Sequence, residues 1–291
     1  MSIHYDLRHF PVADLTWLRD DGFLAGSQVL LLNSAAADTA IVCVHGWRGS
    51  ALGTWEEFPS AIRSVPEAAR TDAFFLNYPS TTLSVSTCAR EAQEFLHDVL
   101  RDPANTIVNP SMPSGGPRRP PGWRYRRVVV MAHSMGAVVS RRALLDLERG
   151  GLSPAEAAAI RLLFFAPAHL GSSLPEFIAS GLGLDWLPGP SLVGRALKVH
   201  YRSLADLEEG SKALDLLLDD NRSKRERRNT SQEPDDHLRA FVLHAWKDKV
   251  VVQDRFDEDH DGRPVPDRHH RSVCKPAGPY RRPIDGLRQL L

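Results

Sequence analysis

The chain of 291 residues is 42% hydrophobic and 25% charged, a composition that supports a sizeable core and excludes a largely disordered protein. Lys+Arg and Asp+Glu both number 36, so the formal net charge is zero and no long-range field favours nucleic acid or an anionic membrane as a partner. We expect one domain over residues 1–291 that acts on a neutral or small molecule.

The N-terminal segment predicts neither export nor a membrane span. The first 22 residues mix charges throughout and contain no apolar signal-peptide core, and nowhere in the sequence do about 20 apolar residues run together. The three cysteines lack metal-ligand spacing, and an odd number cannot pair completely within one chain. These features predict a soluble, cytoplasmic protein.

Short apolar runs bounded by turn residues predict the strands of a mostly parallel sheet covered on both faces. They occupy residues 40–46, 72–80, 125–134, 160–168 and 238–246, and residues 27–34 add an antiparallel strand near the edge. Amphipathic segments at 54–65, 84–100 and 135–150 predict helices between the strands. This alternation predicts a doubly wound α/β fold with right-handed crossovers.

Two stretches interrupt the alternation. Residues 103–123 are rich in Pro and Gly and predict an irregular surface loop. Residues 171–236 form a long insertion with helical periodicity at 192–207 and 211–220. The basic run at 224–229 is balanced by acidic residues on both sides, which indicates a solvated loop and not a nucleic-acid patch.

The strongest local signal is the segment VVVMAHSMGAVVSRRAL, in which a strand ends at Ser134 and a helix follows at once. This context is typical of a nucleophile elbow, a tight turn that projects the serine hydroxyl over the carboxyl edge of the sheet. Small residues are needed beside the serine; Gly136 satisfies this, while Ala132 departs from the first Gly of G-x-S-x-G. We expect Ser134 to be the nucleophile.

An acyl-transfer site also needs two N–H donors aimed at the developing oxyanion. One normally belongs to the residue after the nucleophile, here Met135. The other is expected from the loop after an earlier strand, where Gly46 allows the backbone to turn and present the N–H of Trp47. The alternative is that His45 only ends the strand and Trp47 only packs.

Five segments occur in order between residues 45 and 276: HGWRGSALGTW, LNYPS, VVVMAHSMGAVVSRRAL, FFAPAHLGS and HRSVCKP. In this order they resemble the lipase-type α/β-hydrolases related to GPI inositol deacylases and to serine-active-site phospholipid-remodelling proteins. The resemblance implies hydrolysis of carboxylic esters, often of lipids, with no metal or organic cofactor. Ala168 is inserted relative to the usual P-H-x-G-S pattern, so no catalytic role passes to His169, which we expect to be structural.

The acid of a serine triad follows the nucleophile in this fold, and the histidine follows the acid. Asp248 comes directly after the last predicted strand and is our choice for the acid, with Asp254 as the second choice. For the base, the resemblance places the catalytic histidine three residues before an apolar-Cys-Lys-Pro run, which selects His270. Its neighbour His269 remains an alternative.

The same loop also carries His260, and three histidines among aspartates could hold a metal. A metal site is the less favoured interpretation because the serine elbow already requires a histidine from this loop and no fixed ligand spacing occurs.

The insertion 171–236 falls where hydrolases of this fold often carry a lid over the ligand site. Its apolar stretch has glycines at 181, 183, 189 and 194 that would permit movement. An acyl-chain pocket would be lined by Ile178, Leu182, Leu184, Trp186 and Leu187. A lid of this kind leaves open peripheral contact with a membrane, whereas the alternative is a set of core helices packed on the sheet.

The sequence therefore predicts a serine hydrolase that cleaves carboxylic esters, with lipid or phospholipid acyl esters as the favoured substrates. Two alternatives remain. A partner-gated or non-catalytic protein of the same fold would be consistent with the long insertion and with Ala132. An acyltransferase would use the same triad with an alcohol as acceptor. No protein partner can be named from the sequence.

Overall fold

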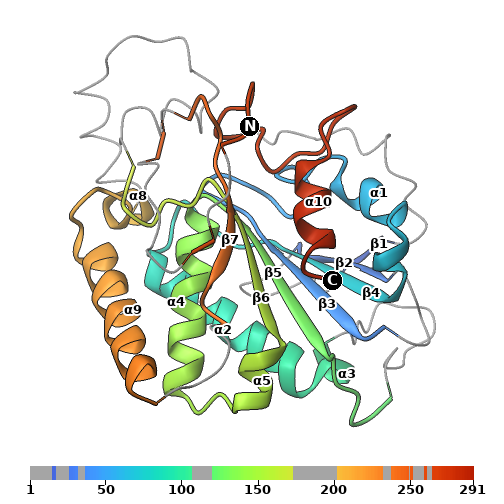
Figure 1. Cartoon of the computed structure of the whole chain (residues 1–291), viewed down its shortest axis with the longest axis horizontal. Helices are drawn as coiled ribbons and strands as arrows, with labels where there is room; N and C mark the ends of the chain where they lie inside the picture. The colour runs from blue at the N-terminus through green and yellow to red at the C-terminus, as the bar shows by residue number, and fades with distance from the viewer. Residues whose placement is uncertain are drawn as a thin grey trace.

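The computed structural model describes residues 15–17, 26–31, 37–106, 120–172, 202–231, 237–248, 250–251, 259–260 and 264–291. Within these residues a sheet of seven strands has the order β1-β2-β4-β3-β5-β6-β7 (Figure 1). The strands are β1 (Leu15–Trp17), β2 (Gln28–Leu31), β3 (Thr39–Val44), β4 (Thr71–Leu76), β5 (Arg127–His133), β6 (Ile160–Phe165) and β7 (Ala240–Leu243).

Strands β3 to β7 are parallel, whereas β1 and β2 add an antiparallel edge. The sheet confirms the predicted mostly parallel α/β fold, including the antiparallel strand near the edge. The short strand β1 was not predicted. Because β3 lies between β4 and β5 in the sheet, the chain reverses its direction of winding there, and the loops after β3 and β5 meet at the carboxyl edge.

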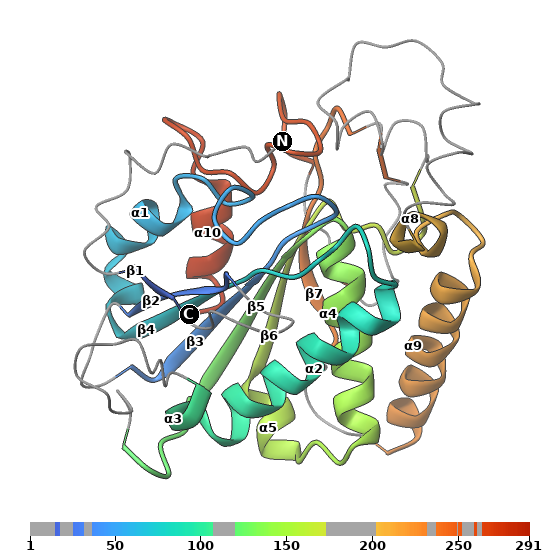
Figure 2. The same cartoon turned by 180° about the vertical axis from the view of Figure 1, so that it is seen from behind.

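Helices cover both faces of the sheet (Figures 1 and 2). Helices α2 (Val85–Arg101) and α4 (Met135–Arg149) pack against each other on one face, and α9 (Lys212–Ser231) packs on α4. On the other face α1 (Phe58–Arg63) contacts α10 (Arg282–Arg288). The remaining short helices are the 3-10 helix Pro66–Arg70, α3 (Pro103–Thr106), α5 (Pro154–Ala159) and α8 (Arg202–Asp206).

The central strands are buried on both faces. Every residue of β3 and of β4 is buried, and in β5 and β6 all but Arg127 and Arg161 are buried. Continuous β-branched and aromatic runs suit this position because a strand covered on both faces has no solvent side to alternate with. The resulting rigid sheet carries the loops that form the candidate site.

Some expectations need correction, and others lie partly outside the described residues. The basic run 224–229 is part of helix α9 and not a loop, because Lys, Arg and Glu are good helix formers and the Lys224 ammonium pairs with Glu148 on α4 at 2.9 Å. The helix expected at 54–65 begins only at Phe58, before Pro59 at its first turn. The first residues of the expected Pro-rich loop are not irregular, because Pro103–Thr106 form the short helix α3. Residues 107–119 of that loop, and 173–201 and 232–236 of the insertion, lie outside the described residues, so the lid remains a prediction.

Among the helices in the described part of the chain, none combines the length and the apolar character needed to cross a membrane.

Candidate active site

Ser134 occupies a sharp turn between β5 and α4. Its backbone has φ of 55° and ψ of −121°, a positive-φ conformation that a residue with a side chain adopts only at a steric cost. The Ser134 N–H donates to the Phe165 carbonyl at 2.9 Å, and the Ser134 carbonyl accepts from the Ala137 N–H at 3.0 Å. The turn therefore holds the Ser134 hydroxyl at the carboxyl edge of the sheet.

The residues on either side of the turn differ in how much space they have. A Cβ atom at Gly136 would lie 2.4 Å from the Val44 carbonyl oxygen and 2.5 Å from that of His45, so only glycine fits. Ala132 is fully buried within β5, in register with Val44 and Phe164. Because Ala132 belongs to the strand and not to the turn, its methyl group fits where the motif usually has glycine.

Three side chains predicted from sequence form one hydrogen-bonded chain. The Ser134 Oγ lies 2.8 Å from His270 Nε2, and His270 Nδ1 lies 2.9 Å from Asp248 Oδ2. The second oxygen of Asp248 accepts from the Val250 N–H at 2.9 Å and the Val251 N–H at 3.3 Å. Asp248 follows β7, at the strand end where the sequence predicted the acid.

The surroundings of Asp248 favour its charged form. Burial alone would raise the pKa of the Asp248 carboxyl, but the hydrogen bond and charge of His270 and the two backbone N–H donors lower this pKa below its ordinary value. The ionised carboxylate fixes the Nδ1–H tautomer of His270, which leaves Nε2 free of hydrogen and able to accept the Ser134 proton.

The alternatives for acid and base lie elsewhere. His269 is exposed, whereas its neighbour His270 is the residue bonded to Ser134, and exposed His260 is tied through its backbone to Ala240 at the start of β7. Asp254 lies outside the described residues. Within the described ranges, no group of three His, Cys, Asp or Glu side chains is arranged to hold a metal ion.

His133, for which the sequence predicted no role, holds the backbone of His270. Its Nε2 lies 2.8 Å from the His270 carbonyl oxygen and the two rings are 4.9 Å apart. Burial, followed by the charge of His270, lowers the pKa of His133 to about 3, so the ring is neutral and its Nε2–H donates to that carbonyl. His133, the residue before Ser134, thus anchors the loop that carries His270.

The two expected oxyanion donors border the same hydroxyl. Met135 is the first residue of α4, and the N–H groups of the first helical turn have no acceptor within their own helix. Gly46 lies so close to the elbow that a Cβ there would be 3.0 Å from both the Ser134 Cβ and the His133 carbonyl oxygen. The backbone that leads into Trp47 therefore runs directly beside Ser134.

His169 does not join this chain of contacts. It is fully buried, and its ring lies 5.5 Å from that of Phe164. Burial, followed by the charge of Arg141, lowers its pKa well below the ordinary value. The inserted Ala168 does reach the elbow, because its N–H donates to the Ser134 carbonyl at 3.4 Å.

No family model and no curated protein sequence matches the chain. The chain does match solved structures. Lipase BlEst2 of Bacillus licheniformis in its mature form is 16% identical, with 88% of this chain and 93% of that chain covered and a TM-score of 0.53. Its propeptide form is 14% identical, with 85% and 50% covered and a TM-score of 0.51. Phospholipase PlaB from Legionella pneumophila is 20% identical, with 72% and 39% covered and a TM-score of 0.45.

At these identities the matches define the fold alone. Together with the strand order and the elbow, the two forms of BlEst2 show that the chain has the α/β-hydrolase fold. Its structural neighbours include lipases, phospholipases and thioesterases.

Proposed function

We propose that the chain is a serine hydrolase that cleaves carboxylic esters. The observation that carries the proposal is the continuous chain from the Ser134 hydroxyl through the His270 ring to the Asp248 carboxylate, with both contacts below 3 Å. A serine on a strained turn that is also hydrogen-bonded to an oriented histidine matches the arrangement by which a weak nucleophile is activated.

The geometry supports a two-step reaction. The Ser134 Oγ attacks the ester carbonyl carbon while His270 Nε2 takes its proton, and the Asp248 carboxylate stabilises the resulting imidazolium. The N–H groups of Trp47 and Met135 donate to the oxyanion. The C–O bond then breaks, the alcohol leaves with the proton from His270, and water repeats the sequence on the acyl-enzyme to release the acid.

Lipid-like acyl esters are the substrates we favour, in line with the resemblance to GPI inositol deacylases and phospholipid-remodelling proteins. Trp246 stands two residues before Asp248 and is 66% exposed, more than any other large hydrophobic side chain of the described residues. A ring left in solvent two residues from Asp248 offers an apolar contact for an acyl chain or for the edge of a lipid layer. The three cysteines are buried and free, which supports a reducing compartment such as the cytoplasm.

Turnover of p-nitrophenyl esters from C2 to C16 tests both parts of the proposal. Wild-type protein should hydrolyse them, and Ser134→Ala and His270→Ala should not. Trp246→Ala should raise KM for the long esters more than for the short ones, whereas Leu216→Ala, which removes an exposed side chain on α9, should change neither. A folded wild type without turnover on any ester would contradict the hydrolase, and a uniform response to Trp246→Ala would contradict the lipid preference.

One observation favours a second candidate, a hydrolase that opens only with a partner. The Ser134 side chain is buried, with the residue 1% exposed, so substrate must displace whatever covers it. In this case short esters would be turned over only after a partner or lipid is added.

An acyltransferase would be recognised by ester products when an alcohol acceptor is supplied, because the same acyl-enzyme serves both reactions.

A further inference from the structure

The peptide unit between Gly46 and Trp47 is held by hydrogen bonds to its carbonyl oxygen. Its carbonyl oxygen accepts two hydrogen bonds, from His45 Nδ1 at 2.7 Å and from the Gly49 N–H at 3.0 Å. In a planar trans peptide the C=O and N–H groups point in opposite directions. Fixing the Gly46 carbonyl therefore fixes the direction of the Trp47 N–H, the donor expected to bind the oxyanion.

The His45 ring uses both of its nitrogens, and the two contacts together allow only one protonation state. Its other nitrogen, Nε2, lies 3.3 Å from the Tyr78 backbone nitrogen. Because a backbone N–H can only donate, Nε2 must be the acceptor, and the ring proton must sit on Nδ1. Burial lowers the pKa of His45 to about 4, so this neutral tautomer is present at neutral pH.

Tyr78 also fixes the plane of the His45 ring and its backbone. The two rings stack with centroids 4.2 Å apart and an angle of 8° between planes. The Tyr78 hydroxyl donates to the His45 carbonyl oxygen, which also packs against Gly136. A residue 33 positions away in sequence thus clamps the turn that carries the oxyanion donor.

We propose that His45, held by Tyr78, is a positioning residue that sets the direction of the Trp47 N–H toward the transition state. This inference rests on the proposed hydrolase function and adds to it. His45 itself touches neither substrate nor reacting atoms, and it acts through the Gly46–Trp47 peptide.

Kinetics of His45→Ala, His45→Asn and Tyr78→Phe test the inference, with the active fraction of each protein measured by fluorophosphonate titration. Loss of the Nδ1–H donor in His45→Ala should lower kcat per active site by about 10- to 100-fold with KM changed less than about twofold, because an oxyanion donor acts in the transition state. Binding of a trifluoromethyl ketone should weaken by the same factor. His45→Asn, whose amide can still donate, should recover part of the loss, and Tyr78→Phe should show a smaller loss of kcat.

His97→Ala is the matched control, because His97 is exposed on α2 and should behave as wild type. An unchanged kcat per active site in folded His45→Ala, or a loss confined to KM, would overturn the inference while leaving the hydrolase intact. A wild type without activity would instead count against the proposed function. Long-range ¹H–¹⁵N NMR of the wild-type His45 ring is independent of activity: a proton on Nδ1 is expected, and a proton on Nε2 would refute the inference.

Discussion

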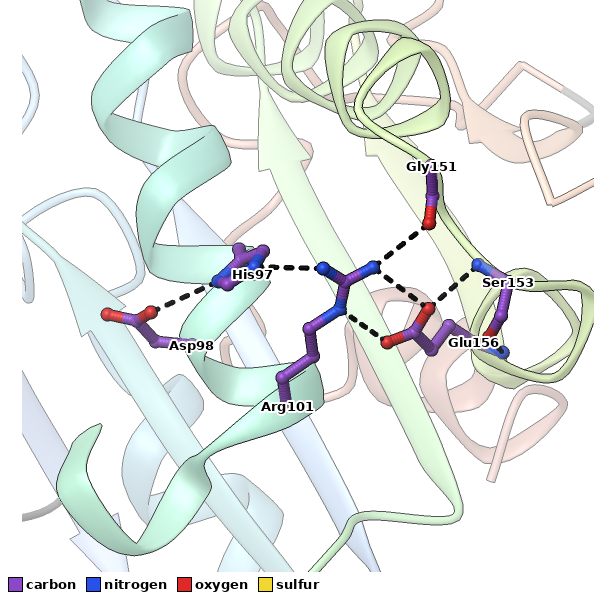
Figure 3. Close-up of polar contacts among 6 residues, drawn as sticks. All are labelled: His97, Asp98, Arg101, Gly151, Ser153 and Glu156. Carbon is purple, nitrogen blue, oxygen red and sulfur yellow. Dashed lines mark hydrogen bonds and ion pairs between the residues drawn. The ribbon is translucent and has the colours of Figure 1, made fainter.

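The two edges of the sheet use polar side chains differently. At the amino edge, Arg101 at the end of α2 donates to the two carboxylate oxygens of Glu156 at 2.7 and 3.3 Å and to the Gly151 carbonyl at 3.0 Å (Figure 3). Ser153 and Glu156 also form a capping box at the start of α5. The Arg101 and Glu156 side chains remain partly exposed, so water can replace these contacts at little cost.

At the carboxyl edge, Ser134, His133 and His270 are all buried, and each is hydrogen-bonded to another member of the group. Water cannot replace their partners, because all three are buried, and the bonds lead through His270 to one strained serine. The comparison indicates that polar contacts at the amino edge join secondary-structure elements, while those at the carboxyl edge orient the side chains of the proposed active site. Substitutions at the two edges should therefore separate stability from activity.

The largest separation is expected between Ser134→Ala and Arg101→Ala. Removal of the nucleophile should lower kcat by at least about 10⁴-fold and change the free energy of unfolding by less than about 1 kcal/mol, because alanine keeps the same backbone. Arg101→Ala should keep full kcat. Ester turnover and urea denaturation measure both quantities, and a comparable loss of kcat in the two variants would refute the division between the edges.

Two glycines provide a second contrast. Gly136→Ala should cost about 3 kcal/mol of stability or more, because its Cβ would overlap two backbone carbonyls. Gly151→Ala at the amino edge should cost only about 1 kcal/mol, since φ of 87° is unfavourable but the space around it is open. Thermal and chemical unfolding measure the difference, and equal costs would contradict the tight packing beneath the elbow.

The edges should also respond to acid in different pH ranges. Burial lowers the pKa of His45 to about 4 and that of His133 to about 3, below the ordinary value of about 6.5. The unfolded chain therefore binds protons first, and the free energy of unfolding should fall as the pH drops below 6.5, by about 1.4 kcal/mol per pH unit for each buried histidine.

The contribution of the amino edge to the free energy of unfolding changes only at lower pH. The hydrogen bond from Arg101 lowers the pKa of Glu156 from 4.5 to about 2, so its stabilisation is complete above pH 4.5 and is lost as the pH falls toward 2. Urea unfolding at pH 7.5, 6.5 and 5.0 tests the histidine range, where the Glu156 contact should still be intact. His133→Asn should flatten the slope, whereas exposed His97→Gln should not, and a flat wild-type profile between pH 6.5 and 5.0 would exclude the buried neutral histidines.

The smallest expected effect is on stability at the amino edge itself. Arg101→Ala should lower the free energy of unfolding by about 1 kcal/mol, because a partly exposed ion pair contributes little in water even when two nitrogens engage the carboxylate. Added salt should reduce the difference from wild type. A loss above about 3 kcal/mol would show that this cluster is a buried structural centre.

Local patterns were enough to predict most of the fold and the residues that meet at the site. Apolar runs predicted five strands of the parallel sheet, and the strand-turn-helix context of Ser134 with the Ser-Asp-His order led to Asp248. The choice of His270 over its neighbours came from the family resemblance. The sequence offered no local signal for the roles of His133 and Tyr78, because their partners lie 137 and 33 residues away. The prediction of a loop at 224–229 was wrong because its charged residues, Lys, Arg and Glu, are good helix formers.

The most direct test of the central claim is labelling with a fluorophosphonate followed by peptide mass spectrometry. Wild type and Arg101→Ala should carry one adduct per chain on Ser134 at similar rates, and His270→Ala should label far more slowly because the hydroxyl loses its base. An adduct on another residue, or a folded wild type that takes up no label, would contradict a serine nucleophile at this elbow.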